Sequence, residues 1–106
     1  MTERFENVTV LTKANVYFDG KVISHTVLFA DGTRKTVGAV LPGEYSFGTG
    51  DREHMEIVAG TAEVLLPGSS TWTKVSAGEF FDVPGNSRFS YRCDGISEYI
   101  CSYIKE

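Results

Sequence analysis

The sequence is poor in several residues on which whole classes of proteins depend. Its 106 residues include only two cysteines, two histidines and one tryptophan, and no apolar run approaches the length of a transmembrane helix. We therefore expect no membrane-spanning helix. Cys93 and Cys101 fall in strand-like segments, and we expect them to be free and buried rather than bridged.

Basic residues are also outnumbered. The chain has 10 Lys and Arg against 14 Asp and Glu, a net charge of −4, and a pI of about 5.1. An acidic surface repels polyanions, so we expect neither a nucleic acid nor an anionic membrane as partner, although one local cationic site can still bind a single phosphate. The polar start, residues 1–7, lacks the features of a signal peptide, and we expect a cytoplasmic protein.

What the chain does contain is a series of turn signals between short strand-like segments. Proline precedes glycine at three places, a pairing typical of type II turns, and Asp31-Gly32 predicts a hairpin between residues 23–30 and 33–40. No segment sustains a 3.6-residue apolar period, so we predict one all-β domain. The other predicted strands are residues 8–11, 16–22, 56–66, 72–75, 80–83, 88–92 and 98–104.

Residues 43–60 and 78–89 resemble the two sequence motifs of the cupin family. The first motif reads H-x-H-x(3,4)-E-x6-G, and the second reads G-x5-P-x-G-x2-H. Here Glu53 lies seven residues before Gly60, and Gly78 and Pro84 match the second motif. The resemblance implies a single-domain, cupin-like jelly-roll β-barrel over residues 15–106. Residues 1–14 are then an N-terminal extension, either flexible or forming an added strand.

Metal-binding side chains are missing where cupins carry histidine. The residues at those positions are Phe47, Thr49 and Phe89. First-row metals need converging imidazole, carboxylate or thiolate groups, and phenylalanine supplies none. A ligand set of Glu53, His54 and Glu56 is an alternative that we disfavour, because adjacent residues of a strand point to opposite faces. We therefore expect no metal and no other cofactor.

Strand alternation predicts which side chains face the interior. If Phe89 points inward, Tyr91 and Cys93 do so too, while Arg88 and Arg92 point outward. The resulting pocket is aromatic, with one hydroxyl and one carboxylate, and suits a flat, partly polar ligand better than an ion. Its predicted lining comprises Tyr45, Phe47, Thr49, Glu53, Met55, Phe89 and Tyr91.

Residues 15–103 also resemble a narrower group, the short bacterial family of pyrimidine/purine nucleoside phosphorylases. Several fixed spacings coincide over nearly the whole chain, which makes the resemblance specific. The matching blocks are residues 15–22, 42–49, 53–55 with Gly60, 64–68, 81–85 with Ser87 and Phe89, and 99–103.

This family resemblance implies a reaction, and the chemistry of that reaction suggests roles for residues. A nucleoside and inorganic phosphate, the co-substrate, would give the free base and ribose 1-phosphate reversibly, with purines and pyrimidines both accepted. Glu53 is the expected catalytic residue, since its carboxylate can bind ribose hydroxyls in an oxocarbenium-like state. Phe47, Phe89 and Tyr91 are expected to stack on the base. Arg34 is the expected phosphate ligand, because its planar fork binds phosphate bidentately. It is chosen from the cations nearest the motifs, which are Lys21, Arg34, Lys35, Arg52 and His54.

Plainer interpretations of the same residues stay open. Phe47 and Phe89, taken singly, are more often core aromatics, and Arg34 suits a solvated hairpin edge. We expect the strand from Tyr99 to Tyr103 to be structural. The alternative function is a non-catalytic cupin module that binds a nucleoside or a sugar. Strand-rich chains of this size often gain stability by pairing, and we expect a homodimer.

Overall fold

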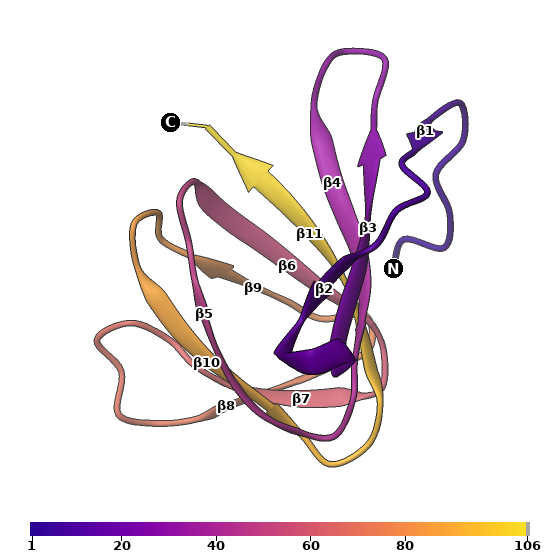
Figure 1. The fold of residues 1–106 in the computed structure, drawn as a ribbon. Helices are drawn as coiled ribbons and strands as arrows, with labels where there is room; N and C mark the ends of the chain where they lie inside the picture. Colours follow the sequence, from indigo (N-terminus) through magenta and orange to yellow (C-terminus); the bar gives the residue numbers. More distant parts are fainter. Residues whose placement is uncertain (106) are drawn as a thin grey trace.

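The computed structural model describes residues 1–105, which form two antiparallel β-sheets facing each other (Figure 1). Position 106, the last of the expected domain, lies outside the described residues. The larger sheet has the strand order β1-β3-β4-β11-β6-β9, with β2 also paired to β3. The smaller sheet has the order β5-β10-β7-β8.

The elements have the following bounds. The larger sheet contains β1 (Thr9–Val10), β2 (Asn15–Tyr17), β3 (Val22–Leu28), β4 (Arg34–Val40), β6 (Arg52–Ala59), β9 (Phe80–Val83) and β11 (Ser97–Ile104). The smaller sheet contains β5 (Gly43–Gly48), β7 (Thr61–Leu65), β8 (Thr73–Ser76) and β10 (Arg88–Cys93). One 3-10 turn, η1 (Phe18–Gly20), links β2 to β3.

The predicted all-β, jelly-roll-like architecture is confirmed. The predicted hairpin across Asp31-Gly32 is also confirmed, since β3 and β4 pair from Val22↔Val40 to Leu28↔Arg34. Over residues 1–105, however, no hydrogen-bonded ladder joins the two sheets into a closed barrel. The β5 edge instead meets the β2–η1 segment through side chains, which leaves room for a cavity between the sheets.

The prediction of one strand over residues 16–22 is wrong in its middle. Phe18, Asp19 and Gly20 have φ angles of 52°, 55° and 90°, and a left-handed backbone cannot continue a strand. For a non-glycine residue such a conformation costs about 1–3 kcal/mol, and here two of them are consecutive. The chain therefore turns between β2 and β3 instead of running straight.

The predicted strand over residues 56–66 is also divided, into β6 and β7. Gly60 separates them with a φ of 78°. A Cβ added there would lie 2.5 Å from the carbonyl oxygen of Ile96, so this turn combines an unusual backbone angle with a close approach. Composition alone conceals the break, because the residues on both sides of Gly60 are strand formers.

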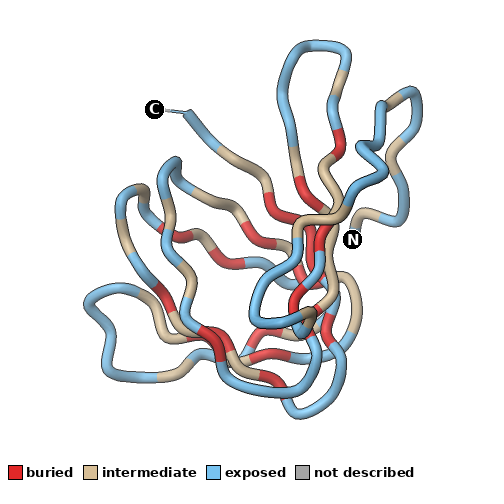
Figure 2. The backbone as a smooth tube through the Cα atoms, in the orientation of Figure 1, coloured by how far each residue is buried: buried red, intermediate tan, exposed pale blue. Residues whose placement is uncertain are grey.

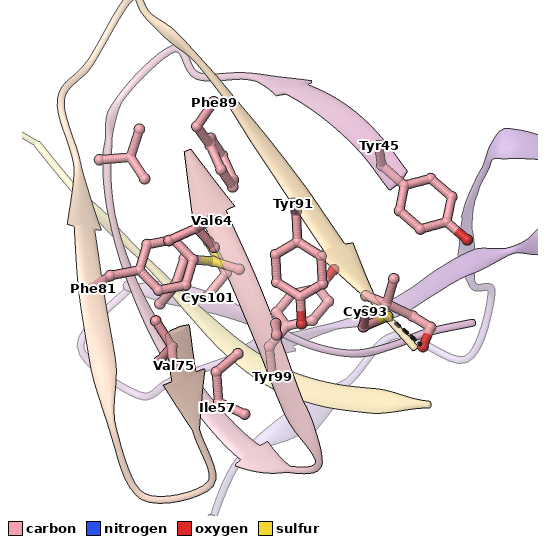
Figure 3. Packing of buried hydrophobic residues seen from close by; sticks show 14 of the residues in the cluster. Tyr45, Ile57, Val64, Val75, Phe81, Phe89, Tyr91, Cys93, Tyr99 and Cys101 are labelled. Carbon is pink, nitrogen blue, oxygen red and sulfur yellow. Dashed lines mark hydrogen bonds between the residues drawn. The ribbon is translucent and has the colours of Figure 1, made fainter. Parts of the chain in front are cut away.

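Buried residues lie mainly on the strands where the two sheets face each other (Figure 2), and their side chains pack into one hydrophobic core that includes part of the cavity lining (Figure 3). The predicted alternation in β10 is confirmed, because Phe89, Tyr91 and Cys93 are buried while Arg88 is exposed. Tyr91 is 1% exposed, and its hydroxyl lies 2.6 Å from the Ser97 hydroxyl, which satisfies both groups. Cys93 and Cys101 are free and buried, as predicted.

The N-terminal residues cross the outer face of the larger sheet. Thr2 donates its backbone N–H to the Glu56 carboxylate at 2.7 Å, and the Phe5 ring packs edge-on against Phe29 at 5.2 Å. Farther along, β1 pairs with the end of β3. Within residues 1–105 the structure has no helix long and apolar enough to cross a membrane.

A close approach between β4 and β11 positions one tyrosine inside the sandwich. Gly38 pairs directly with Tyr99. A Cβ added to Gly38 would lie 2.7 Å from Tyr99 Cζ and 2.8 Å from the backbone oxygen of Ile23. Both distances are below van der Waals contact, so glycine is needed here if the Tyr99 ring is to keep its place.

We predict that Gly38→Ala destabilises the protein by about 1–3 kcal/mol, the usual cost of overpacking a filled interior. Urea unfolding followed by circular dichroism measures the change. Gly95→Ala is the matched control, because a Cβ there meets nothing within 4 Å. Equal stability of the two variants would contradict the proposed packing constraint.

Candidate functional site

A cavity of about 460 Å³ lies between the two sheets. The larger sheet contributes most of its hydrogen-bonding groups, and the smaller sheet contributes mainly aromatic rings. Its principal lining residues are Ser24, Arg34, Thr36, Glu53, Met55, Tyr99, Cys101 and Tyr103 from the larger sheet, Phe47, Phe89 and Tyr91 from the smaller sheet, and Tyr17 and Phe18 from the β2–η1 segment. The cavity thus has a polar wall and an aromatic wall.

Six of the eight residues proposed from the sequence line this cavity. They are Arg34, Phe47, Glu53, Met55, Phe89 and Tyr91. They come from β4, β5, β6 and β10, so the fold brings together segments that are far apart in the sequence. Arg34, chosen as one of several nearby cations, points to the same cavity as Glu53.

The other two, Tyr45 and Thr49, are not among the lining residues. Tyr45 is buried in the core, and its hydroxyl donates to the backbone oxygen of Leu41 at 2.8 Å. The Thr49 hydroxyl donates to the backbone oxygen of Pro84 at 2.7 Å and accepts from the Ser87 N–H. Both hydroxyls therefore stabilise the connections at the ends of β5.

Glu53 and Arg34 flank Tyr103 on the polar wall. The strand register pairs Tyr103 with Glu53, and the Arg34 guanidinium carbon lies 4.0 Å from the centroid of the Tyr103 ring. Thr36 Oγ1 lies 3.3 Å from the Tyr103 hydroxyl. A guanidinium stacked on an aromatic ring is held in place while its N–H groups stay free to bind an anion.

Burial governs the charge state of this wall. It raises the pKa of the Glu53 carboxyl above the usual 4.5, although a hydrogen bond with Cys101 and the charge of Arg34 oppose the rise. Burial, followed by the nearby Glu53 charge, raises the pKa of the Cys101 thiol to about 12. Burial likewise raises the pKa of Tyr103 to about 12. The thiol and the phenol therefore remain protonated donors at neutral pH.

The aromatic wall is a continuous cluster of rings. Phe47 packs against Phe89 with centroids 5.6 Å apart, and against Tyr91 at 6.3 Å. Phe18 joins the cluster from across the gap between the sheets, with its centroid 5.5 Å from that of Phe47. Such a wall offers faces and edges to a flat ligand and few groups that can read its hydrogen-bonding edge.

Sequence reasoning missed the contribution of β11. Tyr99, Cys101 and Tyr103 were expected to be structural, yet all three line the cavity. They alternate with residues of the outer face, and this period of two was the available signal. Tyr17 and Phe18 were also missed, because a segment expected to be one straight strand gives no reason to turn toward the pocket.

The neighbouring histidine belongs to the opposite face of the sheet. Glu53 lines the cavity, while His54 Nδ1 lies 2.9 Å from Asp82 Oδ1, and the His54 ring packs on Phe80 with centroids 4.8 Å apart. Adjacent residues of β6 thus diverge, as predicted. Among residues 1–105 no three His, Cys, Asp or Glu side chains converge as a metal site.

Residues 12–103 match the family model described as pyrimidine/purine nucleoside phosphorylase. The chain belongs to this family. A relative with that name from Hydrogenovibrio crunogenus is 58% identical over 101 residues, which are 95% of this chain and 97% of the relative. Another with the same name, from Syntrophotalea carbinolica, is 54% identical with the same coverage.

Solved structures agree with the family membership and with the predicted fold. A crystal structure of a protein of unknown function from Acinetobacter sp. matches with a TM-score of 0.94 and 44% identity, covering 95% of this chain and 98% of that one. A cupin-2 domain from Rhodospirillum rubrum matches with a TM-score of 0.69 over all of this chain and 75% of that one. At 16% identity this second likeness shows a cupin-like fold alone.

We predict that Glu53→Gln is more stable than the parent protein at pH 7 but not at pH 4. The raised pKa means that the folded protein holds this proton more tightly than the unfolded chain. The stability gained from this bound proton is complete below the pKa of the unfolded chain, near 4.5. It is lost as the pH rises through the pKa of Glu53 in the folded protein. A neutral amide avoids that loss.

Urea unfolding at both pH values measures this difference. Glu44→Gln is the matched control, because it removes the same charge from an exposed position of β5. The pH-dependent gain should appear only at Glu53. A Glu53→Gln variant that is less stable than the control by the same amount at both pH values would contradict the prediction.

Proposed function

We propose that this protein is a nucleoside phosphorylase that converts purine and pyrimidine nucleosides, with inorganic phosphate, to the free base and ribose 1-phosphate, reversibly. Family membership supports the reaction, since relatives that match nearly the whole chain carry the name pyrimidine/purine nucleoside phosphorylase. The observation that carries the proposal to a site is the placement of Arg34 and Glu53 on either side of Tyr103, facing an aromatic wall.

The polar wall suits the sugar and the phosphate. In phosphorolysis the C1′–N bond breaks and its electron pair stays on the departing nitrogen, while a C1′–O bond to phosphate forms. The base gains the proton that the phosphate hydroxyl loses. The ribose carries positive charge in the transition state. Under the proposal, Glu53 binds ribose hydroxyls and stabilises that charge, Arg34 holds the phosphate, and the protonated Tyr103 hydroxyl donates a hydrogen bond.

The aromatic wall suits the base. Every nucleobase has a π-face, so stacking on Phe47 and Phe89 binds purines and pyrimidines alike. The Tyr91 hydroxyl is already hydrogen-bonded to Ser97 and is therefore less available to a ligand. Met55 also lines the cavity, and its flexible thioether can adapt to bases of different size. Broad base specificity is therefore part of the proposal.

The proposed enzyme uses no metal or other cofactor, since phenylalanine occupies two of the cupin ligand positions.

We also propose that it acts in the cytoplasm, where nucleosides and phosphate are available, and that it forms a homodimer. Exposed apolar side chains on β1, β2 and β3 support pairing, namely Val10, Val16, Ile23 and Leu28. Light scattering tests the dimer, and a mass near 11.7 kDa would contradict it.

We predict phosphate-dependent release of base from adenosine, inosine, uridine and cytidine, with rate constants that differ by less than about a thousandfold. Apolar contacts discriminate by only about 1–3 kcal/mol, whereas a site that bonds one base edge rejects others by roughly 10⁴-fold. Absorbance assays with and without phosphate measure release, and a chelator-treated sample should be equally active. Nucleoside binding without release would indicate the alternative, a non-catalytic binding module.

Substitutions should distinguish the roles of the two charged residues, Arg34 and Glu53. Arg34→Gln should raise the KM for phosphate about 10- to 150-fold, the equivalent of a charged hydrogen bond. Lys35→Gln, which removes the same charge from the opposite face of β4, is the matched control. Glu53→Gln should lower the rate roughly 30- to 1000-fold. An unchanged phosphate KM in Arg34→Gln would place the phosphate elsewhere.

A further inference from the structure

The β2–η1 segment presents an aromatic side chain that the sequence analysis did not assign. Phe18 lines the cavity, yet 44% of its surface is exposed. Its ring lies 5.0 Å from that of Tyr45 and 5.5 Å from that of Phe47, both on β5. In Figure 1 this segment lies between β5 and β3. Phe18 therefore bridges the gap that the two sheets leave open.

The backbone holds Phe18 there at an energetic cost. Phe18 and Asp19 both have left-handed φ angles, although neither is glycine. The segment is anchored on both sides, because Asn15 Nδ2 donates to the hydroxyls of Ser24 and Thr26 at 3.2 Å, and the Lys21 N–H donates to the Phe18 carbonyl at 3.1 Å. Strain kept by such anchors is characteristic of ligand-binding segments.

The perpendicular rings form a corner that suits a flat ligand. Phe18 and Phe47 are perpendicular, with an interplanar angle of 89°. A flat molecule placed in this corner lies face to face with one ring and meets the edge of the other, and both arrangements are favourable for aromatic pairs. An aliphatic ligand gains nothing from the perpendicular arrangement.

We infer that Phe18 is a base-binding residue that stacks the nucleobase at the open side of the cavity, and that it sets the balance between purines and pyrimidines. The inference rests on the proposed function. Purines offer the larger π-face, so they gain more from the ring than pyrimidines do. Phosphate and ribose 1-phosphate, which carry no base, gain nothing from it.

The test compares Phe18→Ala, Phe18→Leu and Phe18→Trp with the parent protein. Alanine should raise the KM for adenosine about 5- to 150-fold, the range found when a base-stacking ring is removed. The effect on uridine should be smaller, and the KM for phosphate and for ribose 1-phosphate should not change. Leucine, which keeps bulk without a π-face, should resemble alanine, while tryptophan should restore binding.

Phe80→Ala is the matched control, because Phe80 is 62% exposed on β9 and does not line the cavity. Calorimetric titration with free adenine gives a readout independent of turnover, and only Phe18→Ala and Phe18→Leu should bind it more weakly. If leucine binds and reacts like the parent, Phe18 is only an apolar plug and the inference is wrong. If the parent protein releases no base, the proposed function itself fails.

Discussion

The partial burial of one carboxylate is the constraint around which the rest of this site is arranged. Glu53 lies on the inner face of β6, where burial raises the pKa of its carboxyl, and a charge in such a place is costly unless polar groups surround it. The larger sheet supplies those groups through β11 and β4, with the Cys101 thiol, the Tyr103 phenol and the Arg34 guanidinium. The same groups form the polar wall, so the residues that stabilise Glu53 are also residues of the site.

The open side of the sandwich lies beside the same cavity. Between β5 and the β2–η1 segment no ladder closes the sandwich, and residues of both segments line the cavity. Something must still shield the aromatic wall from water, and Phe18 does so from a strained turn. The turn is tolerated because the rest of the domain is held by long ladders such as β6–β11.

Sequence patterns were sufficient for the parts of this fold that depend on local chemistry. The hairpin at Asp31-Gly32 and the alternation of Phe89, Tyr91 and Cys93 follow from turn propensity and strand period alone. The two divided strands were missed because Gly60 and Phe18–Asp19 are breaks defined by backbone angle, which composition does not reveal. The predicted polar wall lacked Tyr103 for another reason. The contact between Arg34 and Tyr103 depends on pairing between β4 and β11, which are distant in sequence.

The replacement of metal ligands by phenylalanine makes physical sense under the proposed reaction. A divalent cation beside the sugar would oppose the positive charge that develops on ribose as the C1′–N bond breaks. A lone carboxylate in partly desolvated surroundings does the reverse, and its attraction strengthens as that charge grows. The cupin-like frame thus keeps one acidic position of its metal motif, Glu53, and has phenylalanine at two of the three histidine positions, where the proposal places the base. Under the proposed reaction, the carboxylate that would bind a metal ion in a cupin instead stabilises a transient positive charge.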